Sequence, residues 1–162
     1  MFEPGIDDFD DQSVKARLLH AADRELTERG VAASVPMEAI ARRAGVSRAT
    51  AFRQLGIVAD VLVQVALLHA RRHTVRVGKI MQREAGAISK LEAALVYTAR
   101  ELPKDPVLAA LLARRGRAIR DPRVHRVAVD VTEPVLLEGQ RDGEVRSDIS
   151  TDDLVDFLVS SR

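Results

Sequence analysis

A short segment around Gly45 carries the side chains of this sequence best suited to bind another molecule. The segment IARRAGVSRATAFRQLG, residues 40–56, contains arginine, serine, threonine and glutamine but no acidic residue. Hydroxyl and guanidinium groups donate hydrogen bonds to phosphates, an arginine can chelate a guanine edge, and a glutamine can pair with adenine. These residue types therefore indicate contacts with a nucleic acid duplex, although a solvated basic helix would have a similar composition.

The spacing within this segment is that of two short helices joined by a tight turn. Gly45 is expected to end the first helix, and Ser47 to cap the second through the amide of Ala49 or Thr50. The AGVS turn between them is typical of a helix-turn-helix. Arg48 and Arg53 lie on the second helix, where they can reach base edges in the major groove.

Charge is unevenly distributed along the chain. Residues 1–11 hold five acidic and no basic residues, whereas residues 12–58 hold eight basic and four acidic residues, a net charge of +4. The basic excess therefore coincides with the helix-turn-helix. The acidic segment is expected to be a disordered tail, which either competes with DNA for the basic helices or is passive.

The bulk composition excludes several classes of protein. The chain has 162 residues, 46% apolar and 30% charged, with 3% aromatic residues and no cysteine. Disulfides, zinc fingers and thiol catalysis are thereby excluded. No leader segment and no apolar run of about 18 residues is present, which favours a soluble, cytoplasmic protein that is not membrane-bound.

Apolar periodicity and capping residues predict helices throughout and no strand, so the predicted fold class is all-α. Pro134 is expected to kink or break the helix that contains it. One broad apolar face is expected on the longest helix, marked by Val61, Leu62, Val65, Leu68, Arg72, Val75 and Ile80. The helices are predicted from Ser13 to Gly30, from Pro36 to Gly45, from Ser47 to Gly56, from Val58 to Glu84, from Ser89 to Leu102, from Asp105 to Gly116, from Asp121 past Pro134, and from Ser150 or Thr151 onward.

No arrangement of residues typical of catalysis stands out, so neither enzymatic activity nor a cofactor is expected. His69 and His73 are four residues apart on one helix and would share a face, which is the spacing of half a metal site. No third ligand is placed by the sequence. Core or solvated histidines are therefore favoured over a metal site.

The segment LLHAADRELTERGVAASVPMEAIARRAGVSRATAFRQLG resembles the N-terminal DNA-binding domain of the TetR family of bacterial transcriptional regulators. The stretch EGQRDGEVRSDIS resembles the turn before the first dimerisation helix of that family. The resemblance implies three N-terminal helices that bind an operator and a larger helical domain that binds a small molecule and dimerises. The expected division is a tail at 1–11, a helix-turn-helix domain at 12–57 and a ligand-binding and dimerisation domain at 58–162. The residues expected to contact DNA are Arg42, Ser47, Arg48, Ala49, Thr50, Phe52, Arg53 and Gln54.

Three positions depart from the family pattern. Phe52 stands where the family usually has tyrosine, Val58 where it usually has lysine, and Pro36 where it usually has serine or threonine. Each removes a phosphate contact, which would leave anchoring to Arg42, Arg43 and dimer avidity. Family members generally continue for one more helix beyond Arg162, so the chain is either truncated or has an unusual dimer interface.

The helices after Val58 are expected to enclose an elongated, mostly apolar cavity, because few aromatic residues are available to fill it. Its walls are expected from residues 61–76, 89–102, 105–115 and 122–138, with Tyr97 or His125 as the polar contact. The expected function is a homodimeric repressor released from a palindromic operator by a small, largely apolar effector. The alternative is a helical interaction or ligand-sequestering module that has lost operator binding. The predicted pocket residues are Leu62, Val65, His69, Leu95, Tyr97, Thr98, Leu111, His125 and Val127.

Overall fold

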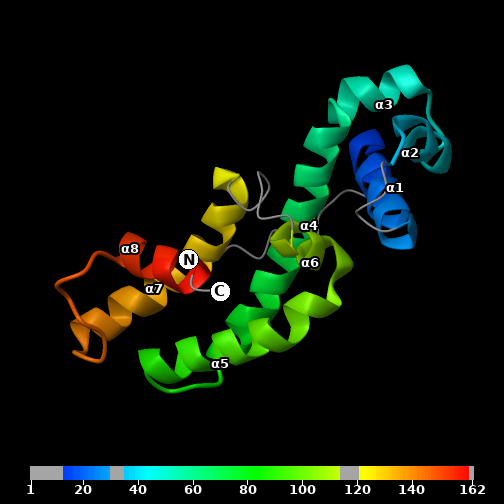
Figure 1. Ribbon diagram of the computed structural model, residues 1–162. Coiled ribbons are helices and arrows are strands. Elements are labelled where there is room, and N and C mark those ends of the chain that lie inside the picture. The colour runs from blue at the N-terminus through cyan, green and yellow to red at the C-terminus, as the bar shows by residue number, and fades with distance from the viewer. Residues whose placement is uncertain (1–12, 30–34, 114–120, 161–162) are drawn as a thin grey trace.

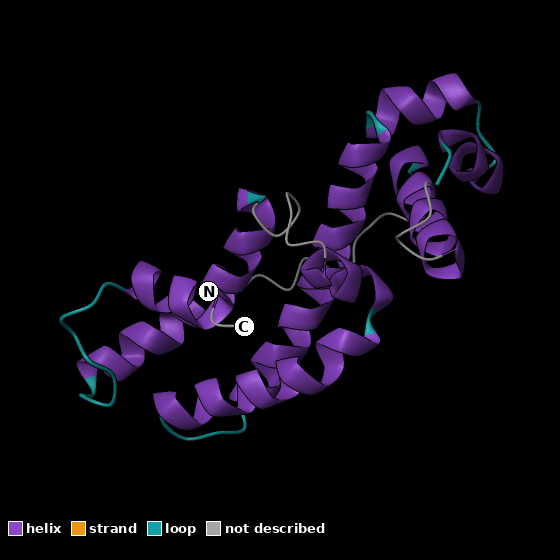
Figure 2. Cartoon of the chain, in the orientation of Figure 1, coloured by secondary structure: helices purple, strands orange, loops and turns teal. Residues whose placement is uncertain are grey.

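The computed structural model describes residues 13–29, 35–113 and 121–160, except for the side chains of residues 110–113 and 159–160. Over these ranges every regular element is a helix and there is no strand, which confirms the all-α fold class (Figure 2). The predictions for the tail at 1–11, for Gly30 and for Gly116 concern positions outside the described residues. The elements are α1 (Val14–Arg29), α2 (Met37–Ala44), α3 (Arg48–Leu55), α4 (Val58–Met81), α5 (Ala87–Glu101), the 3-10 turn η1 (Leu102–Lys104), α6 (Pro106–Ala113), α7 (Pro122–Arg141) and α8 (Thr151–Ser160).

Helices α1, α2 and α3 form one unit whose ends match the predicted capping residues. Ser13 Oγ accepts a hydrogen bond from Ala16 N at 3.0 Å. Gly45 ends α2 at φ 68°, a left-handed conformation that favours glycine and lets the chain reverse into α3. Pro36 differs from its prediction by one position, since it precedes the first turn of α2 as the N-cap residue.

The core of this three-helix unit extends into the next helix. Leu18, Leu26 and Ile40 are almost fully buried, as are Val61 and Val65 of α4. Burial of each such side chain contributes about 1.5–3 kcal/mol relative to exposure. The start of α4 is therefore fixed to the three-helix unit by the same hydrophobic core.

Helix α4 is the long connection between the two ends of the molecule (Figure 1). Its first half buries Val61 and Val65 against the three-helix unit, and its second half buries Val77 and Met81. Arg72, which was expected to mark the same broad face as Val61 and Val65, has an exposed side chain. The helix also ends at Met81, three residues before the predicted Glu84.

Helices α5, α7 and α8 pack at the far end of α4, with α7 against α4, α5 and α8 (Figure 1). Val129, Leu136 and Val155 form a second, smaller core there. Gly139 of α7 allows a close approach, because a Cβ atom at this position would lie 2.6 Å from the Cβ atom of Ala87. Any larger residue at 139 would push α7 away from the start of α5.

Two predicted boundaries in this region differ from the structure. Helix α5 begins at Ala87, two residues before the predicted Ser89. Pro134 does not end its helix, since α7 continues from Pro122 to Arg141. The proline ring lacks an N–H and disfavours a helix locally, but Pro134 is exposed while Val129 and Leu136 on either side are buried. Packing of the buried face outweighs the local penalty.

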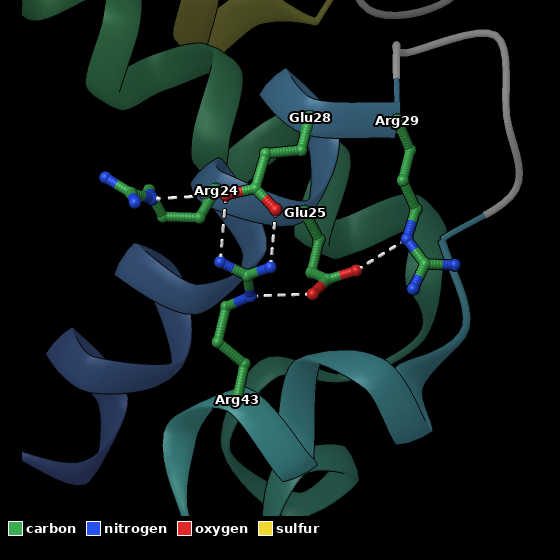
Figure 3. Close-up of polar contacts among 5 residues, drawn as sticks. All are labelled: Arg24, Glu25, Glu28, Arg29 and Arg43. Atoms are coloured by element: carbon green, nitrogen blue, oxygen red, sulfur yellow. Dashed lines mark hydrogen bonds and ion pairs between the residues drawn. The ribbon is translucent and has the colours of Figure 1, made fainter.

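A network of charged side chains joins α1 to α2 (Figure 3). Arg43 Nε donates to Glu25 Oε1 at 2.6 Å, and both Arg43 Nη groups donate to the carboxylate of Glu28. Arg29 Nε lies 2.7 Å from Glu25 Oε2, and Arg24 lies 3.5 Å from Glu28. Glu25 is only 4% exposed, so this carboxylate depends on its two arginines for compensation.

This network changes the interpretation of Arg43. The sequence predicts a phosphate contact at this position, but all three guanidinium nitrogens face carboxylates of α1. The hydrogen bonds from Arg43 hold the pKa of Glu28 below its ordinary value. Arg43 therefore positions α2 on α1. Its neighbour Arg42 is also exposed and lies in the same turn of the helix.

We expect Glu25→Ala to lower the free energy of unfolding by about 1–3 kcal/mol, because the buried carboxylate that accepts a hydrogen bond from Arg43 and pairs with Arg29 is lost. Urea denaturation followed by circular dichroism measures the change. The control is Glu92→Ala on α5, where the glutamate is exposed and the cost should stay within about 0.5 kcal/mol. Equal effects of the two substitutions would show that the network does not stabilise the α1–α2 contact.

Candidate nucleic-acid interface and ligand cavity

Helix α3 is supported on one side and exposed on the other. Ser47 precedes it in an extended conformation, and its Oγ accepts a hydrogen bond from Thr50 N at 3.1 Å. Ala51 and Leu55 are buried in the core, so the opposite face points away from the supporting helices. Helix α3 lies at the opposite end of the molecule from α7 and α8 (Figure 1).

The predicted DNA-contacting residues are brought together on this exposed face and on the last turn of α2. Arg42 lies in the last turn of α2, and the turn from Gly45 to Ser47 places the start of α3 close after this helix. Thr50 is partly buried because its backbone and hydroxyl both lie against Ser47. The exposed members of the set are Arg42, Ser47, Arg48, Ala49, Phe52, Arg53 and Gln54.

Arg48 has two neighbours that sequence reasoning missed. Its guanidinium carbon lies 5.4 Å from the centroid of the Phe52 ring, within range of a cation–π contact. Its Nη1 also lies 3.5 Å from Glu38 Oε1 in the first turn of α2. Phe52 follows Arg48 by four residues, so helical spacing alone could have predicted the first contact. The second depends on the angle between α2 and α3.

A cavity of about 200 Å³ lies between the second half of α4 and helices α5, α6 and α7. Polar groups in its wall are the imidazoles of His73 and His125 and three threonine hydroxyls, and no acidic residue, lysine or arginine is present among its described lining residues. The wall is formed by Ala70, His73, Thr74, Val77, Leu91, Ala94, Leu95, Thr98, Leu102, Leu108, Val124, His125, Val127, Ala128, Val131, Thr132 and Leu158. Such a wall suits an apolar ligand, or the apolar part of a larger one.

The structure places the predicted pocket residues in different surroundings. Leu95, Thr98, His125 and Val127 lie in the cavity wall, whereas the side chain of Leu111 falls outside the description. The remaining four, Leu62, Val65, His69 and Tyr97, are not among the lining residues.

Leu62 and Val65 lie outside the cavity wall because successive parts of α4 pack against different neighbours. Leu62 and Val65 pack into the core of the three-helix unit, and the cavity begins only at Ala70. Lining residues Ala70, Thr74 and Val77 recur at helical spacing, so this stripe was visible in the sequence. The packing of α5 and α7 on α4 decides that these residues of α4, and not others, face the cavity.

The two histidines of the hypothetical half metal site turn toward different partners. His73 Nε2 lies 3.1 Å from the Thr98 hydroxyl, and the His73 ring stacks on Tyr97 at 5.4 Å between centroids. His69 instead lies between the carboxylates of Asp23 and Asp105. Among the described residues, no group of three or more possible ligands could hold a metal ion.

A helix must be both long and apolar to span a membrane. Within the described ranges no single helix is both long and apolar enough to cross a membrane; only the bent pair α3 and α4, 61° apart, meets the criterion jointly.

The chain is similar to known proteins in its N-terminal sequence and in its fold. Residues 18–54 match the family model described as bacterial regulatory proteins, tetR family. No curated protein sequence matches the chain significantly. The fold is similar to that of the transcriptional regulator FadR from Bacillus subtilis, crystallised in complex with stearoyl-CoA, with TM-score 0.67, 18% identity, and coverage of 90% of this chain and 81% of that one. It is also similar to the fatty acid degradation regulator FadR from Bacillus halodurans, with TM-score 0.65, 18% identity, and coverage of 99% and 81%.

We expect Arg48→Ala and Arg53→Ala to change DNA binding differently from Arg42→Ala. Each of the first two should lose about 1–3 kcal/mol of discrimination at particular base pairs, because a bidentate contact to a base is removed. Arg42→Ala should weaken binding to all duplexes alike, as loss of a phosphate contact does. Titration of each variant against duplexes with single base-pair changes distinguishes these patterns. The same loss on every duplex for all three variants would contradict base reading by α3.

Proposed function

The chain carries the N-terminal domain of the tetR family of bacterial regulatory proteins, and from this premise we propose that it is a ligand-responsive repressor of transcription. The exposed face of α3 reads the operator in the major groove. A small, largely apolar effector occupies the cavity beside α4 and releases the protein from DNA. The function is regulatory rather than enzymatic.

One observation carries this proposal: helix α4 contributes both to the core that supports α3 and to the wall of the cavity. Val61 and Val65 belong to the first, whereas His73 and Val77 belong to the second. A ligand that favours one tilt of α4 therefore favours one position of α3. The size of its effect equals the difference in its affinity for the two arrangements.

A homodimer would place two copies of α3 on one palindromic operator. Two-fold related recognition helices reach successive major grooves when they lie about 34–36 Å apart. Large apolar side chains on α7 and α8 support such a dimer, since Leu137 is 46% and Phe157 is 68% exposed in the single chain. Burial of these two helices against a second copy would cover them.

The composition of the cavity favours an acyl chain as the buried part of the effector. The described wall holds no fixed charge, and an ionised group buried without a counter-ion would be strongly disfavoured. The Bacillus subtilis FadR structure contains stearoyl-CoA, whose charged head could stay in solvent while its chain fills an apolar cavity. We therefore propose a long-chain acyl compound as the effector class.

The alternative is a helical module that sequesters a ligand and no longer binds an operator. The side chains that support it are Phe52, which has no hydroxyl for a phosphate, and Val58, which begins α4 without a cation. The ion pair of Arg48 with Glu38 also competes with a contact to DNA. Both candidates share the cavity, so DNA binding is the property that separates them.

Selection of bound duplexes from random DNA tests the proposal directly. A palindrome should emerge, and the protein should bind it more tightly than a scrambled duplex of the same composition at both low and moderate salt. Binding to both duplexes should weaken as salt rises, because phosphate contacts release counter-ions. Recovery of no preferred sequence, with equal affinity for both duplexes at both salt concentrations, would favour the sequestering module.

We expect Ala94→Leu to reduce the effect of stearoyl-CoA on binding of the selected duplex by about tenfold or more, because the larger side chain occupies part of the cavity. Ala94 lies in the cavity wall, whereas Ala99 on the same helix is exposed, which makes Ala99→Leu the matched control. Fluorescence anisotropy of a labelled duplex, with and without stearoyl-CoA, measures the effect. An unchanged response in Ala94→Leu would place the effector elsewhere.

A further inference from the structure

His69 of α4 is held between carboxylates from two other parts of the chain. Its Nε2 lies 2.7 Å from Asp23 Oδ1 on α1, and its Nδ1 lies 2.6 Å from Asp105 Oδ2, directly before α6. The side chains of His69 and Asp23 are only 11% and 13% exposed. Arg72 Nη1 lies 3.6 Å from Asp23 Oδ2, and His20 of α1 is the other titratable group near Asp23.

The geometry requires the charged form of the imidazole. A neutral histidine has one N–H group and can donate to only one carboxylate, whereas the imidazolium donates from both nitrogens. Burial lowers the pKa of His69, but the hydrogen bonds and charges of Asp105 and Asp23 outweigh it and raise this pKa to about 9. Burial likewise opposes ionisation of Asp105, but the hydrogen bond from His69 leaves the pKa of this carboxyl below its ordinary value.

Asp105 also caps α6, the helix that carries Leu108 of the cavity wall. Its Oδ1 accepts hydrogen bonds from Val107 N and Leu108 N, both at 3.0 Å, and so caps α6. Leu102 and Leu108, three residues before and after it, lie in the cavity wall. One carboxylate thus contacts His69 with one oxygen and fixes the wall helix with the other. Any shift of this wall displaces the carboxylate from His69.

We propose that the Asp23–His69–Asp105 bridge is the contact that couples occupancy of the cavity to the position of the three-helix unit, with His69 as the positioning residue. This inference rests on the proposed function. When an effector displaces Leu102 and Leu108, Asp105 moves away from His69. The polar link that runs from Asp105 through His69 to Asp23 of α1 is then broken. The unit formed by α1, α2 and α3 is released from its DNA-binding position.

Energetics favour a positioning role over a purely stabilising one. Desolvation of buried charges roughly offsets their attraction, so a buried ion pair often adds little net stability compared with apolar residues of similar size. Apolar contacts between α6 and the three-helix unit are already supplied by Val107 and Leu108. Such contacts have no preferred direction, whereas two hydrogen bonds donated by one imidazolium to two carboxylates fix both distance and angle.

Asp105→Asn is the decisive variant, because asparagine is also a good N-cap residue but carries no charge. The matched control is Asp121→Asn, since Asp121 also caps a helix, α7, through Arg123 N, but pairs with the guanidinium of Arg123 and not with a histidine. Stearoyl-CoA should weaken binding of the selected duplex by about 5- to 150-fold in the unmodified chain and in Asp121→Asn, the usual range of allosteric coupling. In Asp105→Asn and in Asp23→Asn the same ligand should change the affinity less than about twofold. Full response in both bridge variants would overturn the proposal.

A second measurement needs neither DNA nor effector, so it separates failure of this inference from failure of the proposed function. The chain has no cysteine, and spin labels can be attached at Thr27→Cys on α1 and Glu92→Cys on α5, both exposed positions. The distance distribution between them, measured by pulsed electron resonance, should be narrow at pH 6.5 and broader in Asp105→Asn. Asp121→Asn should match the unmodified chain.

The same distance measurement should depend on pH, because the pKa of His69 is raised in the folded protein. Because the folded-state pKa of His69 is raised from 6.5 to about 9, the contribution of the bridge is fully present below about pH 6.5 and is lost as the pH rises through about 9. The distribution of the unmodified chain should therefore broaden between pH 6.5 and 10, and that of Asp105→Asn should not change further. A distribution that is equally narrow in both proteins at both pH values would overturn the positioning role.

Discussion

The structure depends on one constraint: a single helix, α4, must pack against the three-helix unit with its first half and against α5 and α7 with its second half. Helix α4 has 24 residues and is about 36 Å long at 1.5 Å per residue. Its first half completes the three-helix unit through Val61 and Val65, and its second half meets α5 and α7 around the cavity. Since α4 is one continuous helix, a change in its tilt at one end also changes its tilt at the other. The remaining elements are arranged around the two halves of this helix.

Two charged contacts orient the helices that hydrophobic packing only brings together. Arg43 fixes α2 on α1 through Glu25 and Glu28, and this sets the direction in which α3 is presented. His69 joins α1 to the start of α6. Glu25 in the first contact and His69 in the second are charged side chains of low exposure, and their partners of opposite charge offset the cost of desolvation. Apolar contacts supply most of the stability, and these contacts select one arrangement.

The half of the molecule formed by α5, α7 and α8 encloses a cavity beside a small hydrophobic core. Its second core has few fully buried side chains, namely Val129, Leu136 and Val155. Alanines and threonines occupy many positions around the cavity, and no aromatic ring other than the two imidazoles reaches into it from the described residues. Small side chains on α4, α5 and α7 leave this space open, and an open space lowers stability in proportion to its volume. The close approach at Gly139 keeps α7 against α5 despite this opening.

The sequence by itself determined where the helices lie and which residues cap several of them, because capping and apolar periodicity are local properties. The end of α4 and the start of α5 differ from the predicted positions by three and two residues. Ser13, Ser47, Asp105 and Asp121 cap the helices that follow them, as their positions predicted. The exposed face of α3 was equally predictable, since Ala51 and Leu55 could only face inward.

The tertiary structure alone decided which long-range partners the polar residues have. Arg43 was expected at phosphates and lies instead on two glutamates, and His69 was expected in the cavity and lies between two aspartates 46 and 36 residues away in the chain. Pro134 was expected to interrupt α7, but packing on both sides of it holds the helix together. Each outcome depends on how helices cross, and crossing angles arise from the fit of whole surfaces rather than from any local sequence signal.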